Sequence, residues 1–544
     1  MLEKLFSRAG CKKEAAWARF VFQWLAVSFI LHIIAAVRST GFFHSTEHLR
    51  ILELVNYKLG RSTASDLPPE YHQMILPWLL PALMTGITDF LNTIGVKSPF
   101  DWAVSYRLLA ALLGWLATVG LTLCCYLWFV NKDWRKWAVI SLNLIWYLPA
   151  FHARPSAESM GGSVFFIGLS LLLLASPPLP KLPAIPGKSP LGLLFCVGLL
   201  FGTAFEIKFD TGIMTLGVLF WLLFIARNSA KFSAVRTFAL LSGFAVAVLM
   251  GAWADHWGYG QWTFTPLNFL HSWAGSKVGA PVSVLSGSFH PSVWQLFKET
   301  LALNWPPLGT LVFLSFLLAW CRHPKHILTW CTVPLFLCIS SFSSTQLLQL
   351  FPMIHIGGLM LILSVEKISF EKIGKFVLTP IQRDWLQWTK WAAIGLNLVA
   401  LIMLTTTPAW IPIRFYSRLY TFKPYKFQVN YKDNSLFQID GKTLKFYLPT
   451  DVAFNQIHDY SDLVRILSEQ ESTQWLFNPQ HTLPDSAEQL KKWCKPEFST
   501  LPDWMGTGLE KANTLVSSNS LTNWTLYRCQ SPNLLRSTLE ETEN

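Results

Sequence analysis

Long apolar runs separated by short polar segments dominate the first 409 residues of the chain. A helix needs about 20 mainly apolar residues to cross a bilayer. Such runs occur near residues 18–37, 103–130, 137–152, 159–176, 190–206, 211–226, 237–254, 306–320, 327–342, 346–364 and 391–408. The pattern predicts an α-helical polytopic membrane protein with about eleven transmembrane helices.

Basic residues gather in alternate connections between these runs. Counted through the eleven helices, the clusters all fall on one side: Lys4/Arg8/Lys12/Lys13, Lys132/Arg135/Lys136, Lys181/Lys188, Arg227/Lys231/Arg236, Arg322/Lys325 and Lys367/Lys372/Lys375/Arg383. Cytosolic loops of membrane proteins carry an excess of Lys and Arg. We therefore expect these connections and the N-terminus to be cytosolic. The first run is interpreted as a retained helix, because Ile34-Ala35-Ala36 is a poor signal-peptide cleavage site.

The expected domain division is a transmembrane module over residues 1–409, with outer loops 38–101 and 255–305, followed by an outer domain over 410–544. Alternating polar and apolar residues predict strands at 426–431 and 444–448 and a late strand at 525–527. Helical patterns occur near 460–470 and 485–494. The outer domain should therefore be α/β. Cys494 and Cys529 are isolated within it and are predicted to pair if the compartment is oxidising.

Residues 66–90 of the first outer loop combine a polar start with an apolar run. We interpret them as an amphipathic helix lying on the outer interface, with a short re-entrant helix as the alternative.

Composition supports the membrane assignment. Charged residues make up 14% of the 544 residues and apolar residues 52%, whereas a soluble protein carries about 25% charged residues. The net charge of +12 could indicate nucleic-acid binding, but basic residues of membrane proteins usually lie in cytosolic loops against anionic lipid. The expected partners are membrane lipids and no nucleic acid.

Polar residues that hydrophobic burial cannot explain cluster on the outer side, and ionisable groups at the membrane are functional candidates because they are costly there. The segments are Gly41 to Glu53, Ala153 to Ser159, Phe205 to Thr211, and Asp255 to His271. If the first is helical, His44, Glu47 and His48 share one face.

These segments, in this order, resemble the polyprenyl-phosphate-mannose-dependent (dolichyl-type) mannosyltransferases of the GPI-anchor and N-glycan pathways, which have the GT-C fold. The His-Pro-Asp-Glu motif of that family is similar to His44-Ser45-Thr46-Glu47, with a downstream Glu at Glu53. The Arg-x-x-Ser-Glu-Ser-like segment is similar to Arg154–Ser159, and the Arg-Phe-x-Thr-like segment to Lys208–Thr211. The most specific likeness is Asp255 to Asn268, which contains Tyr259-Gly260-Gln261-Trp262 and Thr265-Pro266. The resemblance covers roughly residues 17–365.

Two departures from the family pattern stand out. Thr46 replaces the motif's Asp, and the His-Lys-Glu-x-Arg-Phe segment associated with the lipid-phosphate donor has become Ser344-Thr345-Gln346-Leu347-Leu348-Gln349. They are compatible with a divergent, bacterial member that uses another polyprenyl carrier, and equally with a catalytically inactive homologue.

The resemblance implies an inverting transfer of a sugar, here mannose, from a polyprenyl phosphate to a lipid-linked glycan at the outer membrane face. Such a reaction needs a carboxylate to take the acceptor's proton, and Glu47 has the residue type and motif for that base; the alternative is an ordinary loop glutamate. His44 and His48 could hydrogen-bond substrate or Glu47, or could bind zinc. We expect no metal and no cofactor beyond the donor.

The remaining candidates are expected to bind substrate. Arg154 and Lys208 suit the phosphate, or alternatively form salt bridges to Glu158, and to Asp210 or Glu206. Glu53 and Asp255 could orient the site or bind sugar hydroxyls. Tyr259, Trp262 and Asn268 fit a sugar-binding loop or an interfacial aromatic belt. The same outer segments contribute Glu158 and His271.

The leading hypothesis is thus a multi-pass membrane glycosyltransferase of a bacterial inner membrane or the endoplasmic reticulum, with its active site on the non-cytosolic side. The alternatives are a transporter or flippase of lipid-linked sugars, disfavoured because no repeat symmetry is evident, and an inactive scaffold that binds partners through residues 410–544.

Overall fold

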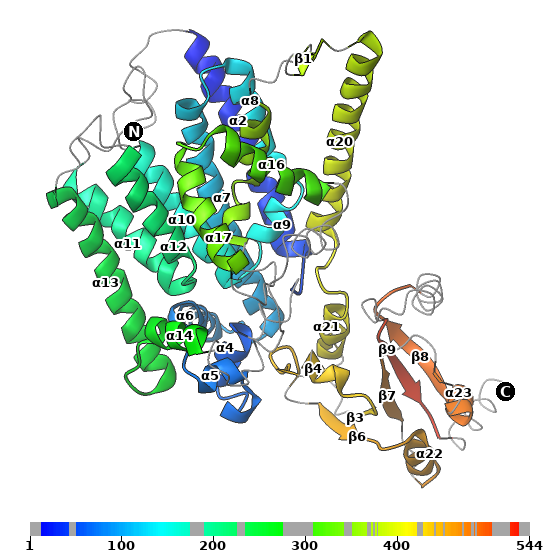
Figure 1. The fold of residues 1–544 in the computed structure, drawn as a ribbon. Helices are drawn as coiled ribbons and strands as arrows, with labels where there is room; N and C mark the ends of the chain where they lie inside the picture. The colour runs from blue at the N-terminus through cyan, green and yellow to red at the C-terminus, as the bar shows by residue number, and fades with distance from the viewer. Residues whose placement is uncertain are drawn as a thin grey trace. The chain divides into compact units, whose positions relative to one another are not determined.

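The chain forms two compact units (Figure 1). The computed structural model describes residues 12–42, 50–174, 190–225, 234–275, 308–341, 351–366, 372–373, 376–377, 379–421, 428–439, 442–449, 452–469, 473–479, 483–484, 487–502 and 523–531. The first unit contains Met1–Ser39, Pro69–Val96 and Trp102–Thr407. The second contains Thr40–Pro68, Lys97–Asp101 and Pro408–Asn544. Parts of the predicted outer loop 38–101 therefore cluster with the C-terminal domain, although the sequence pattern had grouped that loop with the helices.

Apolar helices build the first unit. Among the described residues, five are long and apolar enough to cross a membrane: Ala16–Arg38 of α2 (Lys12–Arg38), α7 (Pro99–Trp128), α10 (Ala157–Leu174), α13 (Ala234–Tyr259) and α20 (Pro380–Thr406). Shorter apolar helices are α11 (Leu191–Ile207), α12 (Thr211–Phe220) with its continuation to Ile225, α16 (Leu308–Arg322) and α17 (Ile327–Ser341). These helices make the chain an integral, multi-pass membrane protein.

Two predicted runs do not form single helices. The run 137–152 is divided between α8 (Lys132–Leu144) and α9 (Leu148–His152). The break precedes Pro149, which has no N–H to donate to the carbonyl of Ile145 and whose ring would clash with that carbonyl in a continuous helix. In the described part of run 346–364, α18 (Phe351–Ile354) is followed by α19 (Gly357–Val365).

The helices of the first unit pack against neighbours that are both adjacent and distant in sequence. α11 lies between α10 and α13, α12 packs against α17, and α16 packs against α19 (Figure 1). α2 contacts α8, α9 and α20. In the segment interpreted as an interfacial helix, the structure has α5 (Pro69–His72) and α6 (Leu79–Thr93). One face of α6, with Leu80, Met84 and Thr88, is buried, and α6 contacts both α11 and α13.

The second unit contains a five-stranded sheet with strand order β6-β3-β7-β9-β8. Its strands are β3 (Gln428–Tyr431), β6 (Ala453–Gln456), β7 (Gln474–Asn478), β8 (Cys494–Ser499) and β9 (Thr525–Cys529). β3, β6 and β7 are parallel, whereas β9 is antiparallel to β7 and β8. The α/β prediction is confirmed by the sheet and by α22 (Tyr460–Glu469) and α23 (Glu488–Trp493).

One predicted strand is wrong. Residues 444–448 contain no strand, and a turn at 446–447 follows the short strand β5 (Lys442–Thr443), which pairs with β4 (Gln438–Ile439). The apolar residues of this segment are nevertheless buried: Leu444, Phe446 and Tyr447 belong to the core of the second unit.

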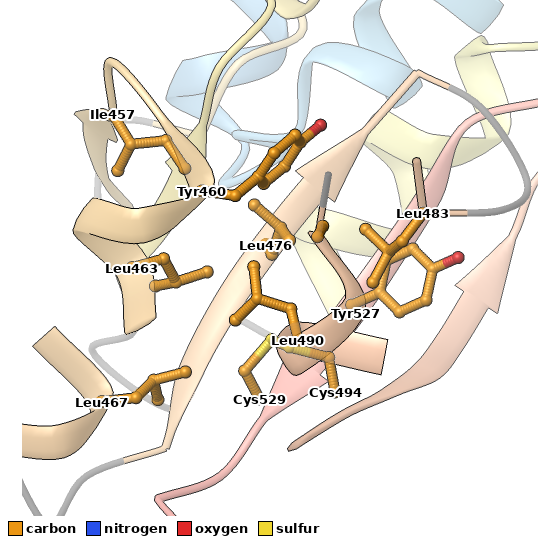
Figure 2. Close-up of a cluster of buried hydrophobic side chains, with 11 residues drawn as sticks. Ile457, Tyr460, Leu463, Leu467, Leu476, Leu483, Leu490, Cys494, Tyr527 and Cys529 are labelled. Atoms are coloured by element: carbon orange, nitrogen blue, oxygen red, sulfur yellow. A yellow bond between two sulfur atoms is a disulfide. The ribbon is translucent and has the colours of Figure 1, made fainter. Parts of the chain in front are cut away.

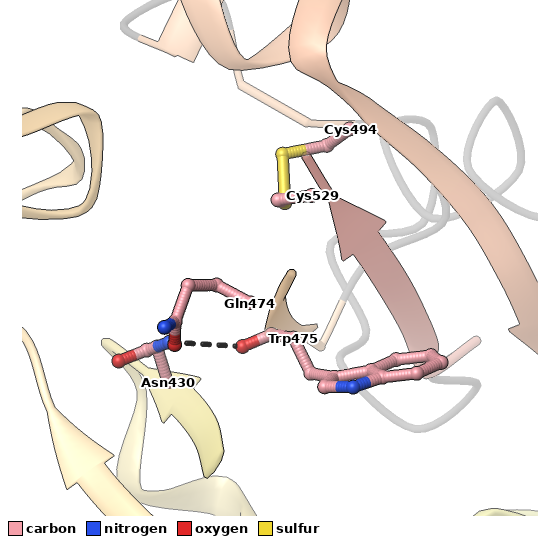
Figure 3. Close-up of a disulfide and its surroundings, with 5 residues drawn as sticks. All are labelled: Asn430, Gln474, Trp475, Cys494 and Cys529. Atoms are coloured by element: carbon pink, nitrogen blue, oxygen red, sulfur yellow. Dashed lines mark hydrogen bonds between the residues drawn. A yellow bond between two sulfur atoms is a disulfide. The ribbon is translucent and has the colours of Figure 1, made fainter. Parts of the chain in front are cut away.

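The core of the sheet lies under α22 and α23. Leu463 and Leu467 of α22, Leu476 of β7 and Leu490 of α23 meet there, beside the disulfide between Cys494 and Cys529 (Figure 2). This confirms the predicted pairing. On β3, the side-chain amide of Asn430 donates to the carbonyl oxygen of Trp475 at 3.1 Å, so that neighbouring parallel strands are also joined through side chains (Figure 3).

Candidate functional site

Arg154 lies in the turn between α9 and α10, where Pro155 prevents one continuous helix. Its side chain is fully buried, and its guanidinium donates a hydrogen bond to the hydroxyl of Ser39, just after α2 ends. The hydroxyl of Ser156 accepts from the backbone N–H of Ser159 at 3.2 Å and so caps the start of α10. Arg154 therefore joins the adjoining ends of α2 and α10.

Lys208 follows the last turn of α11 and carries two ionic contacts. Its ammonium lies 3.0 Å from Oε1 of Glu158, in the first turn of α10, and 3.3 Å from Oδ2 of Asp210. The Lys208 side chain is 14% exposed and that of Glu158 7%. Lys208 and Glu158, both predicted to bind substrate, are thus brought together as an ion pair. The sequence analysis considers Asp210 and Glu206 as acidic partners of Lys208 on its own segment, and the structure pairs Lys208 with Asp210.

Asp255, in the last turn of α13, is fully buried. Its Oδ1 accepts the backbone N–H of Trp78 at 2.9 Å, and its Oδ2 accepts the hydroxyl of Thr265. Trp78 is the residue before α6, and Thr265 begins α14 (Thr265–Gly275). Asp255 thereby holds the starts of two helices at the end of α13.

Tyr259 and Asn268 contact the segment before α6. The Tyr259 hydroxyl donates to the carbonyl of Leu76 at 2.9 Å and accepts the N–H of the same residue at 3.2 Å. The Asn268 amide donates to the carbonyl of Met74 at 3.2 Å. Met74 has a φ of +53°, which is uncommon for a residue other than glycine. The two predicted sugar-binding residues thus hold a tight turn in place.

Glu53 belongs to the second unit, in α4 (Leu52–Lys58). Its Oε1 accepts the backbone N–H groups of Lys445 and Phe446 at 2.8 and 2.9 Å. The side chain therefore joins the loop after α2 to the C-terminal domain inside that unit.

Glu47, the predicted base, lies outside the described residues. Its neighbours His44, Thr46 and His48 and the altered segment 344–349 also lie outside them. His271 lies exposed on α14. Within the described part of the chain, no group of three or more His, Cys, Asp or Glu residues is placed to hold a metal ion.

The structure also joins histidines that sequence reasoning missed. Nε2 of His32, in α2, lies 2.9 Å from Nδ1 of His152, whose ring is 4.9 Å from that of His355. Nε2 of His355 lies 3.1 Å from both the Ser163 hydroxyl and the Ser159 carbonyl. The proximity of His355 to the Arg154–Ser159 segment could not be predicted from the sequence, because 196 positions separate Ser159 and His355.

The fold defines the class of protein. The structure is similar to that of ArnT from Cupriavidus metallidurans bound to undecaprenyl phosphate, with a TM-score of 0.50 and 11% identity over 93% of this chain and 97% of that one. The apo form of ArnT gives a TM-score of 0.48 at 12% identity, over 94% and 98%. An oligosaccharyltransferase from Archaeoglobus fulgidus gives 0.41 at 11%, over 75% and 60%. The architecture is that of a membrane-embedded GT-C protein.

The family follows from the sequence. Residues 23–344 match the model of the Alg9-like mannosyltransferase family, and the chain belongs to that family. No curated protein matches the chain. The protein is a membrane glycosyltransferase, and the matched region contains all four polar segments that the sequence analysis singles out.

Proposed function

We propose that the protein transfers mannose from a polyprenyl-phosphate donor to a hydroxyl group of a lipid-linked glycan, with inversion, at the non-cytosolic face of the membrane. The observation that carries the proposal is the family match over residues 23–344. The ArnT structure with a similar fold was determined bound to undecaprenyl phosphate, which supports a lipid phosphate of that kind as the carrier.

The buried charges support a site at one end of the helices. Arg154 and Ser39, Glu158 and Lys208, and Asp255 and Trp78 all lie where helices of the first unit begin or end. A transfer from a lipid carrier needs its charged groups at the membrane surface, because an isolated charge within hydrocarbon is costly. The disulfide between Cys494 and Cys529 supports an oxidising compartment, and the basic clusters in the alternate connections support the opposite, cytosolic side.

In the proposed reaction, the Glu47 carboxylate takes the proton of the acceptor hydroxyl as that oxygen forms a bond to the sugar's anomeric carbon. The bond between that carbon and the phosphate oxygen breaks, and the phosphate leaves on its polyprenyl chain. Lys208 is the cation we assign to the leaving phosphate, which would replace Asp210 as a partner of its ammonium. Arg154 is fully buried against Ser39 and would fix the position of the Arg154–Ser159 segment. No cofactor is required by this scheme.

The direct test is transfer by the purified full-length protein in lipid nanodiscs. Polyprenyl-phosphate donors carrying mannose, glucose or galactose would each be offered with a lipid-linked glycan acceptor, and the products identified by mass spectrometry. We expect mannosylated product from the mannose donor. Transfer of another sugar alone would contradict the assigned donor, and no transfer from any donor would contradict the proposed function.

The sidedness is tested separately by cysteine labelling in intact cells. The native chain has an exposed cysteine, Cys321, next to Arg322, so the free cysteines are first replaced by serine. In that background, a cysteine introduced beside Arg322 should resist a membrane-impermeant reagent, and one introduced beside Trp262 should react. Labelling near Arg322 from outside would place the basic connections on the wrong side and would overturn the orientation.

A further inference from the structure

Small residues at every fourth position line the contact between α11 and α13, which lie side by side in Figure 1. A Cβ atom on Gly198 would lie 1.9 Å from the carbonyl oxygen of Leu240, and one on Gly202 would lie 2.6 Å from that of Phe244. The two helices therefore pack backbone against backbone, as helices with small residues at this spacing do in membranes.

Each row of small residues ends in a carboxylate. On α11 the row is Gly198, Gly202 and then Glu206; on α13 it is Gly243, Ala247, Gly251 and then Asp255. Residues four apart share a helix face, so each carboxyl group belongs to a face that forms this contact. A Cβ on Gly251 would lie 2.1 Å from Oε2 of Glu206. Gly251 thus leaves the space that the Glu206 carboxyl group occupies.

The two carboxyl groups differ in their partners. Asp255 accepts hydrogen bonds from Trp78 and Thr265 through its two oxygens. Glu206 is 1% exposed, and among the described residues neither of its carboxyl oxygens has a hydrogen-bond partner. A buried polar group without a partner destabilises a fold by about 1–3 kcal/mol, and a charged one by more. The described residues therefore give no structural account of a glutamate here.

We propose that Glu206 is a substrate-binding residue whose carboxyl group hydrogen-bonds hydroxyl groups of the donor's sugar. This inference rests on the proposed function. A sugar hydroxyl can serve a carboxyl group as donor or acceptor, whereas a phosphate would be repelled by the neighbouring Asp255. A metal ion would need more oxygen ligands, and both oxygens of Asp255 are already engaged.

The surroundings of Glu206 fit this role. Lys208, two residues further on, lies on the other side of α11, where a Cβ on Gly161 of α10 would be 3.0 Å from its Cβ. At the end of α11, the ammonium of Lys208 thus faces α10, and the carboxyl group of Glu206 faces α13. This arrangement matches a ligand with a phosphate at one end and a sugar at the other. α6 packs against both α11 and α13, so a sugar bound at Glu206 would also contact α6.

The test combines stability with donor recognition in the full-length protein. Glu206→Gln should leave the midpoint of thermal unfolding unchanged and Glu206→Met should raise it, because the lost group has no partner. Both should lower kcat/KM for the donor by about 10–100-fold, the size expected for a hydrogen bond to a carboxylate. Gly251→Ala keeps the glutamate but displaces its carboxyl group, and should lower kcat/KM similarly.

A series of monodeoxy-mannose donors separates binding from a structural role. Wild-type protein should lose about 10–100-fold in kcat/KM on at least one deoxy donor, and Glu206→Met should be indifferent to that same deletion. If the wild-type protein transfers the sugar and both Glu206 variants have unchanged kcat/KM, the inference on Glu206 is overturned but the proposed function is not. The same conclusion follows if the deoxy donors lower kcat/KM equally in wild type and in Glu206→Met. Absence of any wild-type transfer would overturn the proposed function and this inference with it.

Discussion

Two buried glutamates, one in each unit, show how differently the two regions use the same side chain. Glu53 in the second unit and Glu206 in the first are each 1% exposed. The carboxylate of Glu53 accepts two backbone N–H groups, from Lys445 and Phe446, and lies 3.4 Å from the Asn56 amide. That of Glu206 has no hydrogen-bond partner among the described residues.

The difference separates a group whose hydrogen bonds stabilise the fold from one that the described residues leave without a partner. Hydrogen bonds to a charged group contribute about 1.5–3 kcal/mol, whereas an unsatisfied buried group opposes folding. Burial alone would place both glutamates in one category. Their partners assign Glu53 to the architecture of the second unit and leave Glu206 available to a ligand.

The largest stability effect is expected in the second unit, on removal of its disulfide. The bond between Cys494 and Cys529 closes a separation of 35 residues, for which the loss of chain entropy predicts about 4 kcal/mol. Replacing both cysteines by serine should therefore speed hydrogen exchange of β7, β8 and β9, with α11 and α13 of the same protein as internal reference. Unchanged exchange in these strands would show that the disulfide does not stabilise the sheet.

The next effect tests the two glutamates directly. Glu53→Gln replaces a charged acceptor by a neutral one and should lower the free energy of unfolding of the second unit by about 1–3 kcal/mol. Glu206→Gln should leave the stability of the first unit unchanged. Hydrogen exchange of α4 and α11 in the two variants measures both changes. Equal destabilisation by the two substitutions would remove the contrast between the two residues.

The smallest effect concerns a partly exposed ion pair of the second unit. Burial raises the pKa of Asp66, but hydrogen bonds from Thr63 and from Lys445, at 2.9 Å, outweigh it and lower the pKa below its ordinary value. The pair's stabilisation is thus fully present above about pH 4, the ordinary pKa, and is lost as the pH falls through the lowered value.

Lys445→Met should accordingly destabilise the second unit by about 0.2–1 kcal/mol at pH 7, the size of an exposed pair. The difference from wild type should fade as the pH falls through the lowered pKa of Asp66, once Asp66 is protonated in both proteins. A difference that stays constant through the protonation of Asp66 would show that lost packing of the lysine stem, and not the charge, is responsible.

The sequence was informative where a pattern repeats along one element. Apolar runs predicted the helices of the first unit, and the prediction of a helix near 460–470 is confirmed by α22. The division of run 137–152 could have been predicted too, since Pro149 lies within it. The apolar residues at 444–448 were misassigned because turn residues can be buried as deeply as strand residues.

The candidate site was predictable only as a set of segments. Arg154, Lys208 and Asp255 were identified by residue type and by family resemblance, yet their partners Ser39, Glu158 and Trp78 are 50 to 177 positions distant. Pairings of this kind depend on how the helices pack, which periodicity does not encode. Glu206 was considered only as a partner of Lys208, because nothing in the sequence distinguishes a paired carboxylate from an unpaired one.

The measurement that tests the account most directly is the rate of sugar transfer by the Glu47→Gln variant. This substitution keeps the shape of the side chain and removes its ability to accept a proton. Loss of a general base commonly costs about 10²–10⁴-fold in rate, so kcat should fall by that amount while the protein remains folded. Thr46→Asp, which restores the motif of the family, should retain activity. Near wild-type transfer by Glu47→Gln, with Glu53→Gln or Asp255→Asn inactive but folded, would contradict the assignment of Glu47 as the base.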